Sequence, residues 1–109
     1  MGLDFNTYQE QASRTADKSL QEKSILISCM GLAGEAGEVS DYLKQVYGHG
    51  HAYEHKKLID EQGDVLWYIA DLANKHGVDL ETIAKNNILK LQNRYPNGFD
   101  KNKSINRED

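Results

Sequence analysis

Three features of the sequence predict an all-α fold. The apolar residues recur with helical periodicity along nearly the whole chain, the alternating pattern of strands is absent, and the 109 residues include a single proline, Pro96. A chain of this length corresponds to one domain, and it can bury about 60–70% of its unfolded surface. We therefore expect one all-α domain over residues 1–100, followed by a polar tail over residues 101–109.

The first two of four predicted helices lie before the glycine- and histidine-rich sequence GHGHAY. The first helix covers roughly residues 3–16. The sequence SLQE at residues 19–22 has the pattern of a capping box, which indicates the start of the second helix. That helix runs to about Tyr47, and GHGHAY forms the turn that follows it.

The third and fourth predicted helices are bounded by clear stop signals. The third runs from about residue 54 to residue 76 and stops at Gly77, which is typical of a helix C-terminus. Asp79 is a suitable N-cap for the fourth helix, which ends before Pro96. From Lys101 onward the chain is polar, and we expect it to be frayed.

The second and third helices each carry a stripe of seam residues that step by four and three positions, as helix-packing stripes do. The stripe of the second helix is Ile25, Cys29, Leu32, Ala36, Val39, Leu43 and Val46; that of the third is Leu58, Gln62, Val65, Ile69, Leu72 and His76. Joined by a short turn, the two helices are predicted to pack through these stripes as an antiparallel hairpin at the core of a four-helix, bundle-like domain. Cys29 is expected to be a small buried residue.

Four acidic residues lie beside these stripes. Glu35 and Glu38 are three residues apart on the second helix, and Glu61 and Asp64 are three apart on the third, so each pair shares one helix face. The midpoint between residues 35 and 64 is also the midpoint between residues 38 and 61, and it falls in the turn. The hairpin should therefore place Glu38 opposite Glu61 and Glu35 opposite Asp64.

Four converging carboxylates need a counter-charge, because like charges beside a core repel one another. A hard divalent cation such as Mg²⁺ supplies it, since Mg²⁺ binds carboxylate oxygens and phosphates. The alternative is a solvated acidic face, or pairing with lysines. Nearby glycines (Gly31, Gly34, Gly37 and Gly63) allow a helix or a ligand to approach the backbone, or serve helix packing alone.

The overall composition excludes several classes. The net charge of −4 argues against a generally basic surface, so no stable nucleic-acid complex is expected. The single cysteine excludes an intrachain disulfide, which suits a reducing compartment. No secretory signal pattern and no apolar run of about 20 residues occurs, so we expect a cytoplasmic protein without a membrane helix.

The two acidic motifs resemble those of the MazG-like nucleotide pyrophosphohydrolases, an all-α superfamily. The sequence GLAGEAGEV, followed by DEQGDVLWYIADLA, matches the family pattern of Glu-x-x-Glu, a spacer and Glu-x-x-Asp. The resemblance implies Mg²⁺-dependent hydrolysis of a nucleoside triphosphate to a monophosphate and pyrophosphate, with Mn²⁺ as a substitute. It implies metal ligation by Glu35, Glu38, Glu61 and Asp64, and it favours Glu38 as the residue that orients the attacking water or takes its proton.

Positive charge for the substrate is expected from the fourth helix. Asn87, Lys90 and Arg94 step by three and four, so they form one stripe that could hold sugar and phosphates. The family segment N-x-x-K-L-x-x-R-Y-P has the same residues, although a solvated basic face would give the same spacing. Lys44, on the second helix, is a weaker phosphate candidate.

Oligomerisation is expected because the second and third helices carry more apolar residues than two neighbours cover, and because the family commonly assembles. We expect a homodimer or homotetramer, with a site completed by a second subunit. Two other functions remain open. One is a related pyrophosphohydrolase acting on phosphoribosyl-ATP or on one preferred deoxynucleotide, and the other is a non-catalytic helical module that holds a structural metal.

Overall fold

The part of the chain that the structure describes consists of five helices joined by short connections. The computed structural model describes residues 2–19 and 23–108, and its helices are α1 (Phe5–Ser13), α2 (Ser24–His49), α3 (His55–Lys75), α4 (Leu80–Arg94) and α5 (Lys101–Ile105). No strand occurs among these residues, so the predicted all-α class is confirmed. None of the described helices is long and apolar enough to cross a membrane.

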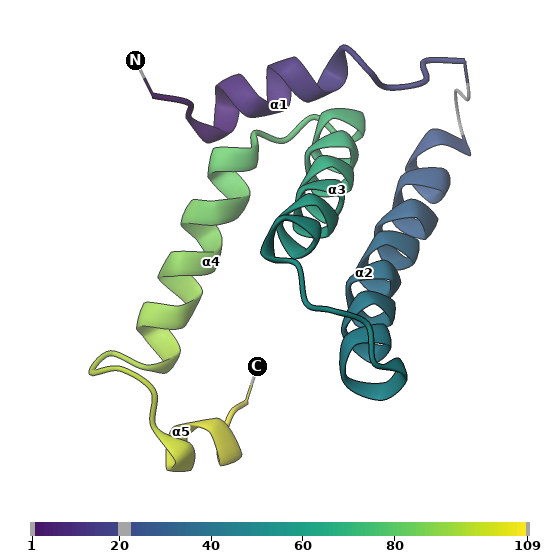
Figure 1. Cartoon of the computed structure of the whole chain (residues 1–109). Helices are drawn as coiled ribbons and strands as arrows, with labels where there is room; N and C mark the ends of the chain where they lie inside the picture. The colour runs from purple at the N-terminus through teal and green to yellow at the C-terminus, as the bar shows by residue number, and fades with distance from the viewer. Residues whose placement is uncertain (1, 20–22, 109) are drawn as a thin grey trace.

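The helices pack in a bundle-like arrangement around an antiparallel pair. Figure 1 shows α2 and α3 side by side, α1 across one end of α3, and α4 leading away from the pair. The main packing partners are α2 with α3, α1 with α3 and α4, and α3 with α4. The predicted hairpin is therefore confirmed as the centre of the fold.

The hairpin turn is fixed by a glycine and a tyrosine. Helix α2 continues to His49, two residues beyond the predicted end, and Gly50 follows in the left-handed region with φ of 76°. Tyr42 is buried, and its hydroxyl accepts a hydrogen bond from the Glu54 backbone N–H at 2.6 Å and donates one to the Glu54 carbonyl at 3.1 Å. These bonds hold the start of α3 against α2.

In the connection between α3 and α4, the end of α3 is as predicted, but the side chain that caps the start of α4 is not the predicted one. Gly77 has φ of 71°, and the Val78 N–H bonds to the Ala73 carbonyl at 3.0 Å, so the predicted glycine stop is confirmed. Asp79 occupies the N-cap position of α4, but its side chain makes no capping hydrogen bond. The cap comes from α1 instead, because the buried Gln9 accepts a hydrogen bond from the Leu80 N–H at 2.7 Å.

Helix α1 is shorter than predicted at both ends. Asp4 caps its N-terminus by accepting a hydrogen bond from the Thr7 N–H at 2.7 Å, and this bond lowers the pKa of Asp4. The predicted capping box at residues 19–22 falls largely on residues 20–22, which lie outside the described residues. Ser19 is described, and its hydroxyl donates to the Asp17 carboxylate at 2.6 Å.

The predicted frayed tail is wrong for its first five residues. Residues Lys101–Ile105 form α5, although they are polar. The Asp100 side chain accepts hydrogen bonds from the N–H groups of Asn102 and Lys103, and this N-cap stabilises the first turn of α5.

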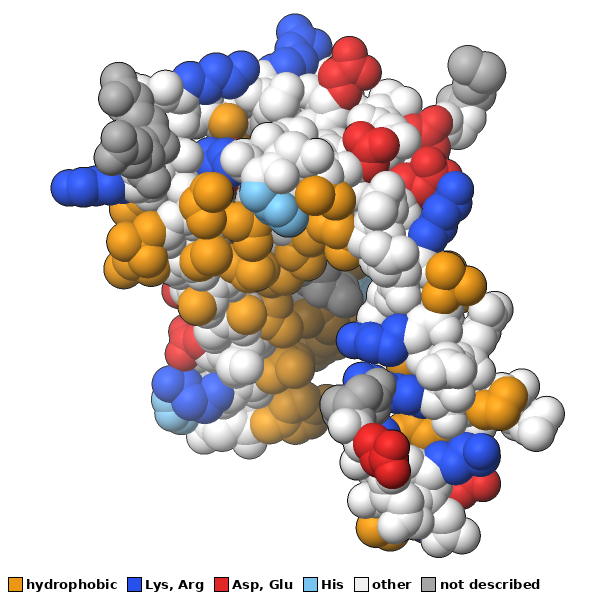
Figure 2. Space-filling view, turned by 180° about the vertical axis from the view of Figure 1, so that it is seen from behind, with side chains coloured by type: hydrophobic (Ala, Val, Ile, Leu, Met, Phe, Trp, Pro, Cys, Tyr) orange, Lys and Arg blue, Asp and Glu red, His pale blue; other side chains and the backbone are white. Residues whose placement is uncertain are grey.

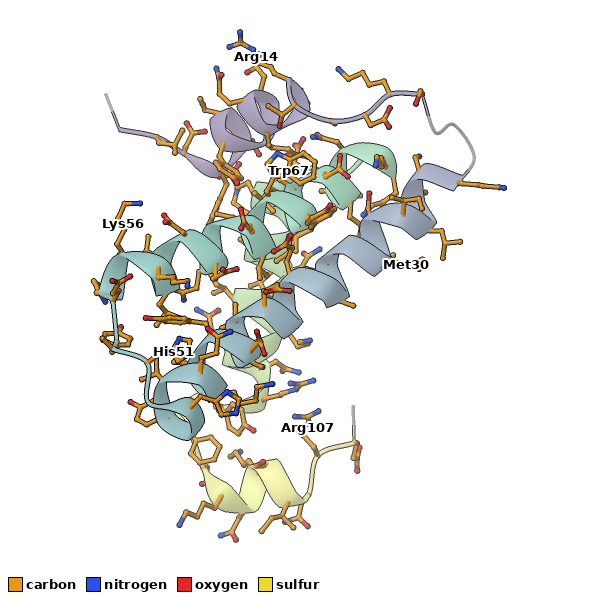
Figure 3. All side chains as sticks on the ribbon, turned by 45° about the vertical axis from the view of Figure 1, so that its right-hand side comes forward. Arg14, Met30, His51, Lys56, Trp67 and Arg107 are labelled. Atoms are coloured by element: carbon orange, nitrogen blue, oxygen red, sulfur yellow. The ribbon has the colours of Figure 1, made fainter. Side chains whose placement is uncertain are left out.

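The core of the single chain is small. Ala12, Ala70 and Leu80 are buried together, and Tyr8, Trp67 and Ile69 pack against them. Trp67 lies between α3 and α1, where its indole N–H donates to the Thr15 hydroxyl at 2.9 Å (Figure 3). Many large apolar residues stay exposed, and Figure 2 shows hydrophobic side chains gathered in a broad patch on one face. The described chain therefore leaves much of its apolar surface uncovered.

Candidate metal and nucleotide site

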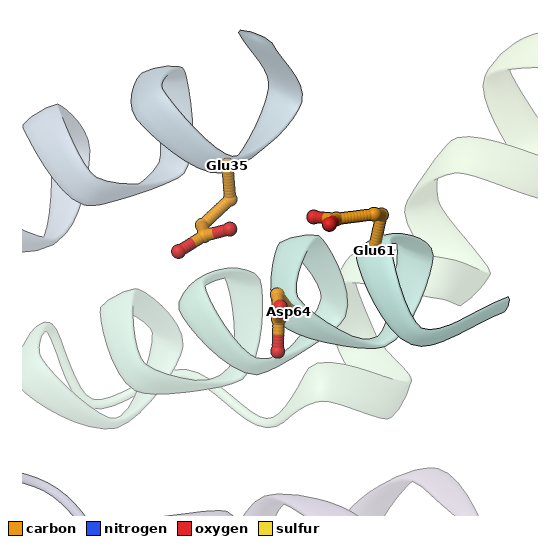
Figure 4. Close-up of side chains that lie close together, drawn as sticks. All are labelled: Glu35, Glu61 and Asp64. Carbon is orange, nitrogen blue, oxygen red and sulfur yellow. The ribbon is translucent and has the colours of Figure 1, made fainter. Parts of the chain in front are cut away.

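Three carboxylates, one from α2 and two from α3, converge across the hairpin. Each of Glu35, Glu61 and Asp64 has an oxygen within 4.8 Å of an oxygen of the other two (Figure 4). Glu35 and Glu61 are half-buried and Asp64 is exposed, so solvent can reach the group from the Asp64 side. We call these three residues the acid cluster.

The predicted register of the hairpin accounts for this convergence. Ser28 bonds to Asp71, and the backbone of Gly31 lies against the ring of Tyr68. In residue number, each of these two pairs is centred between residues 49 and 50. The pair Glu35 and Asp64 is centred at the same point, so all three pairs belong to one register of the hairpin. The register that the sequence predicts is therefore confirmed by contacts outside the acid cluster.

Of the four motif glycines, Gly31 alone is needed for packing among the residues that the structure describes. A Cβ atom at Gly31 would overlap the ring of Tyr68, so no larger residue fits while that ring stays in place. A Cβ atom at Gly34, Gly37 or Gly63 would meet nothing within 4 Å. Close helix packing therefore explains Gly31, whereas the space beside the other three is open to a ligand or a second chain.

The acid cluster is electrostatically unfavourable without a counter-charge. Burial raises the pKa of Glu35 above its ordinary value, and the negative charges of Asp64, Glu61 and Glu38 raise it further. Burial also raises the pKa of the Tyr8 hydroxyl, and Asp64 adds to that shift. A residue of α1 thus lies within electrostatic reach of the cluster.

Glu38, the fourth predicted acidic residue, lies outside the acid cluster. It is exposed on α2, one turn beyond Glu35, and it acts on Glu35 through its charge. The structure thus brings together three of the four predicted carboxylates. The roles of all four in metal binding and catalysis stay predictions.

The predicted packing stripes are displaced from the real interface by about one residue. Helix α3 is contacted through Ser28, Gly31 and Tyr42, which lie one residue before positions of the predicted stripe. Cys29 belongs to that stripe and is exposed, so its predicted burial is wrong. These described contacts use a serine, a glycine and a tyrosine of α2 in place of the apolar residues of the predicted stripe. The exposed position of Gln62 explains why a polar residue is tolerated there.

The predicted phosphate-binding residues lie on α4 and α2. Asn87 and Lys90 are exposed on α4, and Arg94 is half-buried at the end of that helix. Arg94 lines a cavity whose walls include none of the three clustered carboxylates. Lys44 is exposed on α2, where its ammonium forms an ion pair with Asp41 at 3.0 Å.

A buried polar network near the start of α2 has no counterpart in the predictions. Ser28 is fully buried, and its hydroxyl donates to the Asp71 carboxylate at 2.6 Å. The Lys75 ammonium lies 2.8 Å from the same Asp71 oxygen and 2.7 Å from the Ser28 hydroxyl. Asp71 and Lys75 are four residues apart on α3. Exposed ion pairs on a helix have the same spacing, so the sequence does not indicate that this pair is buried.

Comparison with known proteins identifies the family. A profile of the MazG nucleotide pyrophosphohydrolase domain matches residues 23–99. The chain belongs to this family. The matched region of this MazG protein runs from the start of α2 to the segment before α5, so it contains the acid cluster and Glu38. Membership of this family supports a nucleotide substrate and pyrophosphohydrolase chemistry.

One curated relative shows a similarity that extends over most of the chain. It is the "Gene 37 protein" of Mycobacterium phage L5, which is 39% identical over 82 residues, or 72% of each chain. None of the solved structures matches this MazG protein significantly.

Proposed function

We propose that this MazG protein hydrolyses (deoxy)nucleoside triphosphates between the α- and β-phosphates. The products are a nucleoside monophosphate and pyrophosphate, and the cofactor is Mg²⁺, which Mn²⁺ can replace. The observation that carries this proposal is the acid cluster, three carboxylates with oxygens within 4.8 Å of one another inside the MazG domain.

The chemistry of the acid cluster fits a hard divalent cation. Glu35, Glu61 and Asp64 present carboxylate oxygens, the ligand type that Mg²⁺ and Mn²⁺ accept, and the group contains no histidine or cysteine for zinc. The raised pKa of Glu35 reflects a burial cost and a repulsion that a cation would offset. The chemistry that such an ion supplies is charge neutralisation and Lewis-acid polarisation of the phosphate oxygens.

Glu38 has the properties of the residue that handles the attacking water. Its carboxylate is exposed and lies outside the acid cluster, yet its charge reaches Glu35. We assign Glu38 to orienting the water for in-line attack at the α-phosphorus and to accepting its proton. Glu35, Glu61 and Asp64 then hold the ion, with Glu38 as an additional ligand in the complete site.

The substrate phosphates require positive charge beside the acid cluster. We assign Lys90 and Arg94 of α4 to the phosphates, Asn87 to the sugar or base, and Lys44 to a secondary phosphate contact. The assignment of Asn87, Lys90 and Arg94 is supported by their single stripe on α4 and by the family segment that contains them.

A homodimer or homotetramer is the proposed functional form. Leu26 and Met30 on α2 are 59% and 63% exposed, and Ile88 and Leu89 on α4 are 54% and 62% exposed. A second copy of the chain that covers these residues would also bring its own α4 stripe toward the site. The open space beside Gly34, Gly37 and Gly63 leaves room for that approach.

Pyrophosphate release from a panel of nucleoside and deoxynucleoside triphosphates tests the proposed function. We expect monophosphate and pyrophosphate in Mg²⁺ or Mn²⁺, none in chelator, and a loss of at least about a hundredfold in Glu38→Gln. Asp60→Asn is the matched control, because Asp60 is an exposed α3 acid outside the acid cluster.

The same panel separates the alternatives. Orthophosphate and a nucleoside diphosphate as the only products would contradict cleavage between the α- and β-phosphates. Phosphoribosyl-ATP is included as a substrate, and turnover of that compound alone would assign the related activity. If the metal stabilises the protein but no compound is hydrolysed, the protein is a non-catalytic helical module that binds a structural metal.

A further inference from the structure

We propose that a cavity at the N-terminal end of α1 binds the base of the substrate nucleotide and prefers a base that carries an amino group. The inference rests on the proposed hydrolysis of nucleoside triphosphates, and it concerns the choice among these substrates. The cavity has a volume of about 600 Å³, which is within the size range of small-molecule sites. Figure 1 shows the N-terminal end of α1 beside the start of α4, and the walls of the cavity come from both of these helices and from α3.

Tyr8 connects this cavity with the acid cluster. Its side chain lines the cavity and packs against the small core. Burial raises the pKa of the Tyr8 hydroxyl and the negative charge of Asp64 raises it further, so the two side chains lie within electrostatic reach of each other. Leu66, two residues after Asp64 on α3, forms another wall of the cavity. A nucleotide whose phosphates lie at the acid cluster can therefore place its base beside Tyr8.

The apolar walls of the cavity suit the flat face of a base. Phe5 and Leu3 line it and are 48% and 69% exposed, and the half-buried Leu66 lines it from α3. Bases stack on aromatic rings and pack against aliphatic side chains. A bound base would therefore cover apolar side chains that the described chain leaves in contact with water.

The polar side of the cavity offers hydrogen-bond acceptors. Three carboxylates line it, those of Asp4, Glu10 and Glu81, and its walls include no lysine or arginine. Asp4 is already used as the N-cap of α1, and Glu81 accepts a hydrogen bond from the Asn6 amide at 3.3 Å. Within the described part of the chain, the Glu10 carboxylate has no hydrogen bond or ion pair. Glu10 is therefore the acceptor that a ligand in this cavity can use.

This lining selects for N–H donors and against phosphate. Carboxylates repel the negative charge of a phosphate, whereas one carboxylate can accept two parallel N–H groups. Guanine presents two N–H groups side by side on one edge, and adenine and cytosine present one amino group. Thymine and uracil present a single N–H between two carbonyl oxygens, which a carboxylate repels. We therefore expect guanine to bind best, and thymine and uracil to bind worst.

The α1 wall of the cavity lies outside the match to the MazG domain, which begins at residue 23. The acid cluster lies inside that match, so the reaction at the phosphates and the choice of base depend on different parts of the chain. Asn87, which we assigned above to the sugar or base, is then left for the sugar. The cavity needs no metal, so its ligand can be tested in chelator.

Steady-state hydrolysis of dGTP and of dTTP by the full-length chain tests the proposal. We expect Glu10→Gln to raise KM for dGTP at least about tenfold, because it removes a charge-assisted hydrogen bond, and not to raise KM for dTTP. A rise in KM at constant kcat reports lost binding rather than lost chemistry. Phe5→Ala should raise KM for both substrates, because stacking does not depend on the edge of the base.

Two exposed residues outside the cavity provide matched controls. Asp60→Asn removes an acid of α3 and Ile105→Ala removes an apolar side chain of α5, and neither residue lines the cavity. Both variants should keep KM for dGTP within about twofold of the wild-type value. Phe5→Tyr, which keeps an aromatic ring, should retain most of the affinity. Circular dichroism of each variant checks that the helix content is unchanged.

Binding of nucleosides that carry no phosphate separates this proposal from the proposed hydrolysis. Saturation-transfer NMR in chelator should show saturable binding of deoxyguanosine, weaker binding of thymidine, and loss of the deoxyguanosine signal in Glu10→Gln. Glu35→Gln should keep this binding while losing metal-dependent hydrolysis. Deoxyguanosine binding in a protein that hydrolyses no triphosphate would support the base site and contradict the proposed function.

The base site is overturned if hydrolysis occurs but neither Glu10→Gln nor Phe5→Ala changes KM for any substrate. The absence of deoxyguanosine binding in chelator also overturns it. An equal rise of KM for dGTP and dTTP in Glu10→Gln would show that this carboxylate does not distinguish the bases, and the preference for an amino group would then be wrong.

Discussion

At the scale of single residues, Tyr68 and Gly31 set how closely the two central helices approach. The ring of Tyr68 occupies the position of a Cβ atom at residue 31, so α2 and α3 can come together only if residue 31 has no side chain. The acid cluster lies one turn along the hairpin, where Glu35 faces Asp64. The separation of the carboxylates therefore depends on a contact that contains no acid.

Gly31→Ala should destabilise the protein despite the higher helix propensity of alanine. Overpacking costs about 1–3 kcal/mol and the gain in propensity is about 0.8–1 kcal/mol, so we expect a net loss of up to about 2 kcal/mol in the free energy of unfolding. Urea denaturation measures it. Gly48→Ala is the control on the same helix, because its Cβ would meet only Lys44 Cγ at 3.9 Å.

The contact with Tyr68 can be tested separately from the glycine itself. In a Tyr68→Ala background the overlap is absent, so adding Gly31→Ala should cost nothing or stabilise the protein. An undiminished cost in that background would show that Tyr68 is not the reason for the glycine.

Asp71→Ala should lower the free energy of unfolding by about 3–5 kcal/mol. It leaves the buried Ser28 hydroxyl and the largely buried Lys75 ammonium without their carboxylate partner. Asp60→Ala is the control. It breaks the ion pair between Asp60 and Lys56, which are also four residues apart on α3. That pair is exposed, so its loss should cost less than about 0.5 kcal/mol. Equal losses in the two variants would contradict the buried role of Asp71.

At the scale of elements, α1 acts as the cap of α4. The Gln9 amide donates to the Val78 carbonyl at 2.8 Å and accepts from the Leu80 N–H at 2.7 Å, and the Asn74 amide donates to the Gln9 carbonyl at 3.2 Å. One side chain thus satisfies the backbone on both sides of Asp79. The orientation of α4 depends on a residue about 70 positions earlier in the chain.

Gln9→Ala should destabilise the protein by about 2–6 kcal/mol and should increase amide exchange first at the start of α4. The reason is that two backbone groups at the α3–α4 connection lose their partner, at about 1–3 kcal/mol each. Hydrogen exchange and urea denaturation measure the two effects. Gln11→Ala, an exposed substitution on the same helix, should change neither. Unchanged exchange at α4 in Gln9→Ala would mean that the cap is dispensable.

The elements also show which features the sequence could predict. The all-α class, the glycine stop after α3 and the hairpin register follow from local signals and from the position of the turn. The sequence predicts the wrong face of α2 as the face that packs against α3, by about one residue. The reason is that α2 has more than one apolar face, and residue spacing alone does not say which of them meets α3. The Gln9 cap and the Ser28–Asp71 bond are contacts between distant positions, so no local pattern indicates them.

At the scale of the whole molecule, the chain has more apolar surface than its own helices cover. Helix α4 packs against α1 and α3 but leads away from α2 (Figure 1), and Leu26, Met30, Ile88 and Leu89 are all more than half exposed. The residues buried against one another inside the chain are mainly small. The homodimer or homotetramer proposed above would bury these surfaces against another copy of the chain.

Met30→Glu should therefore convert an assembled protein into a monomer. Met30 is 63% exposed, and a carboxylate that becomes buried without a partner opposes association strongly, so we expect the dissociation constant to rise at least a hundredfold, or about 2.7 kcal/mol. Light scattering coupled to size exclusion, over a range of protein concentrations, gives the mass and the dissociation constant. Ile105→Glu is the matched control, because Ile105 is 79% exposed on α5, away from α2, and its substitution should leave the assembly intact. A wild-type protein that is monomeric at about 100 μM, or a control that dissociates as readily as Met30→Glu, would show that the apolar face of α2 is not an interface between copies of the chain.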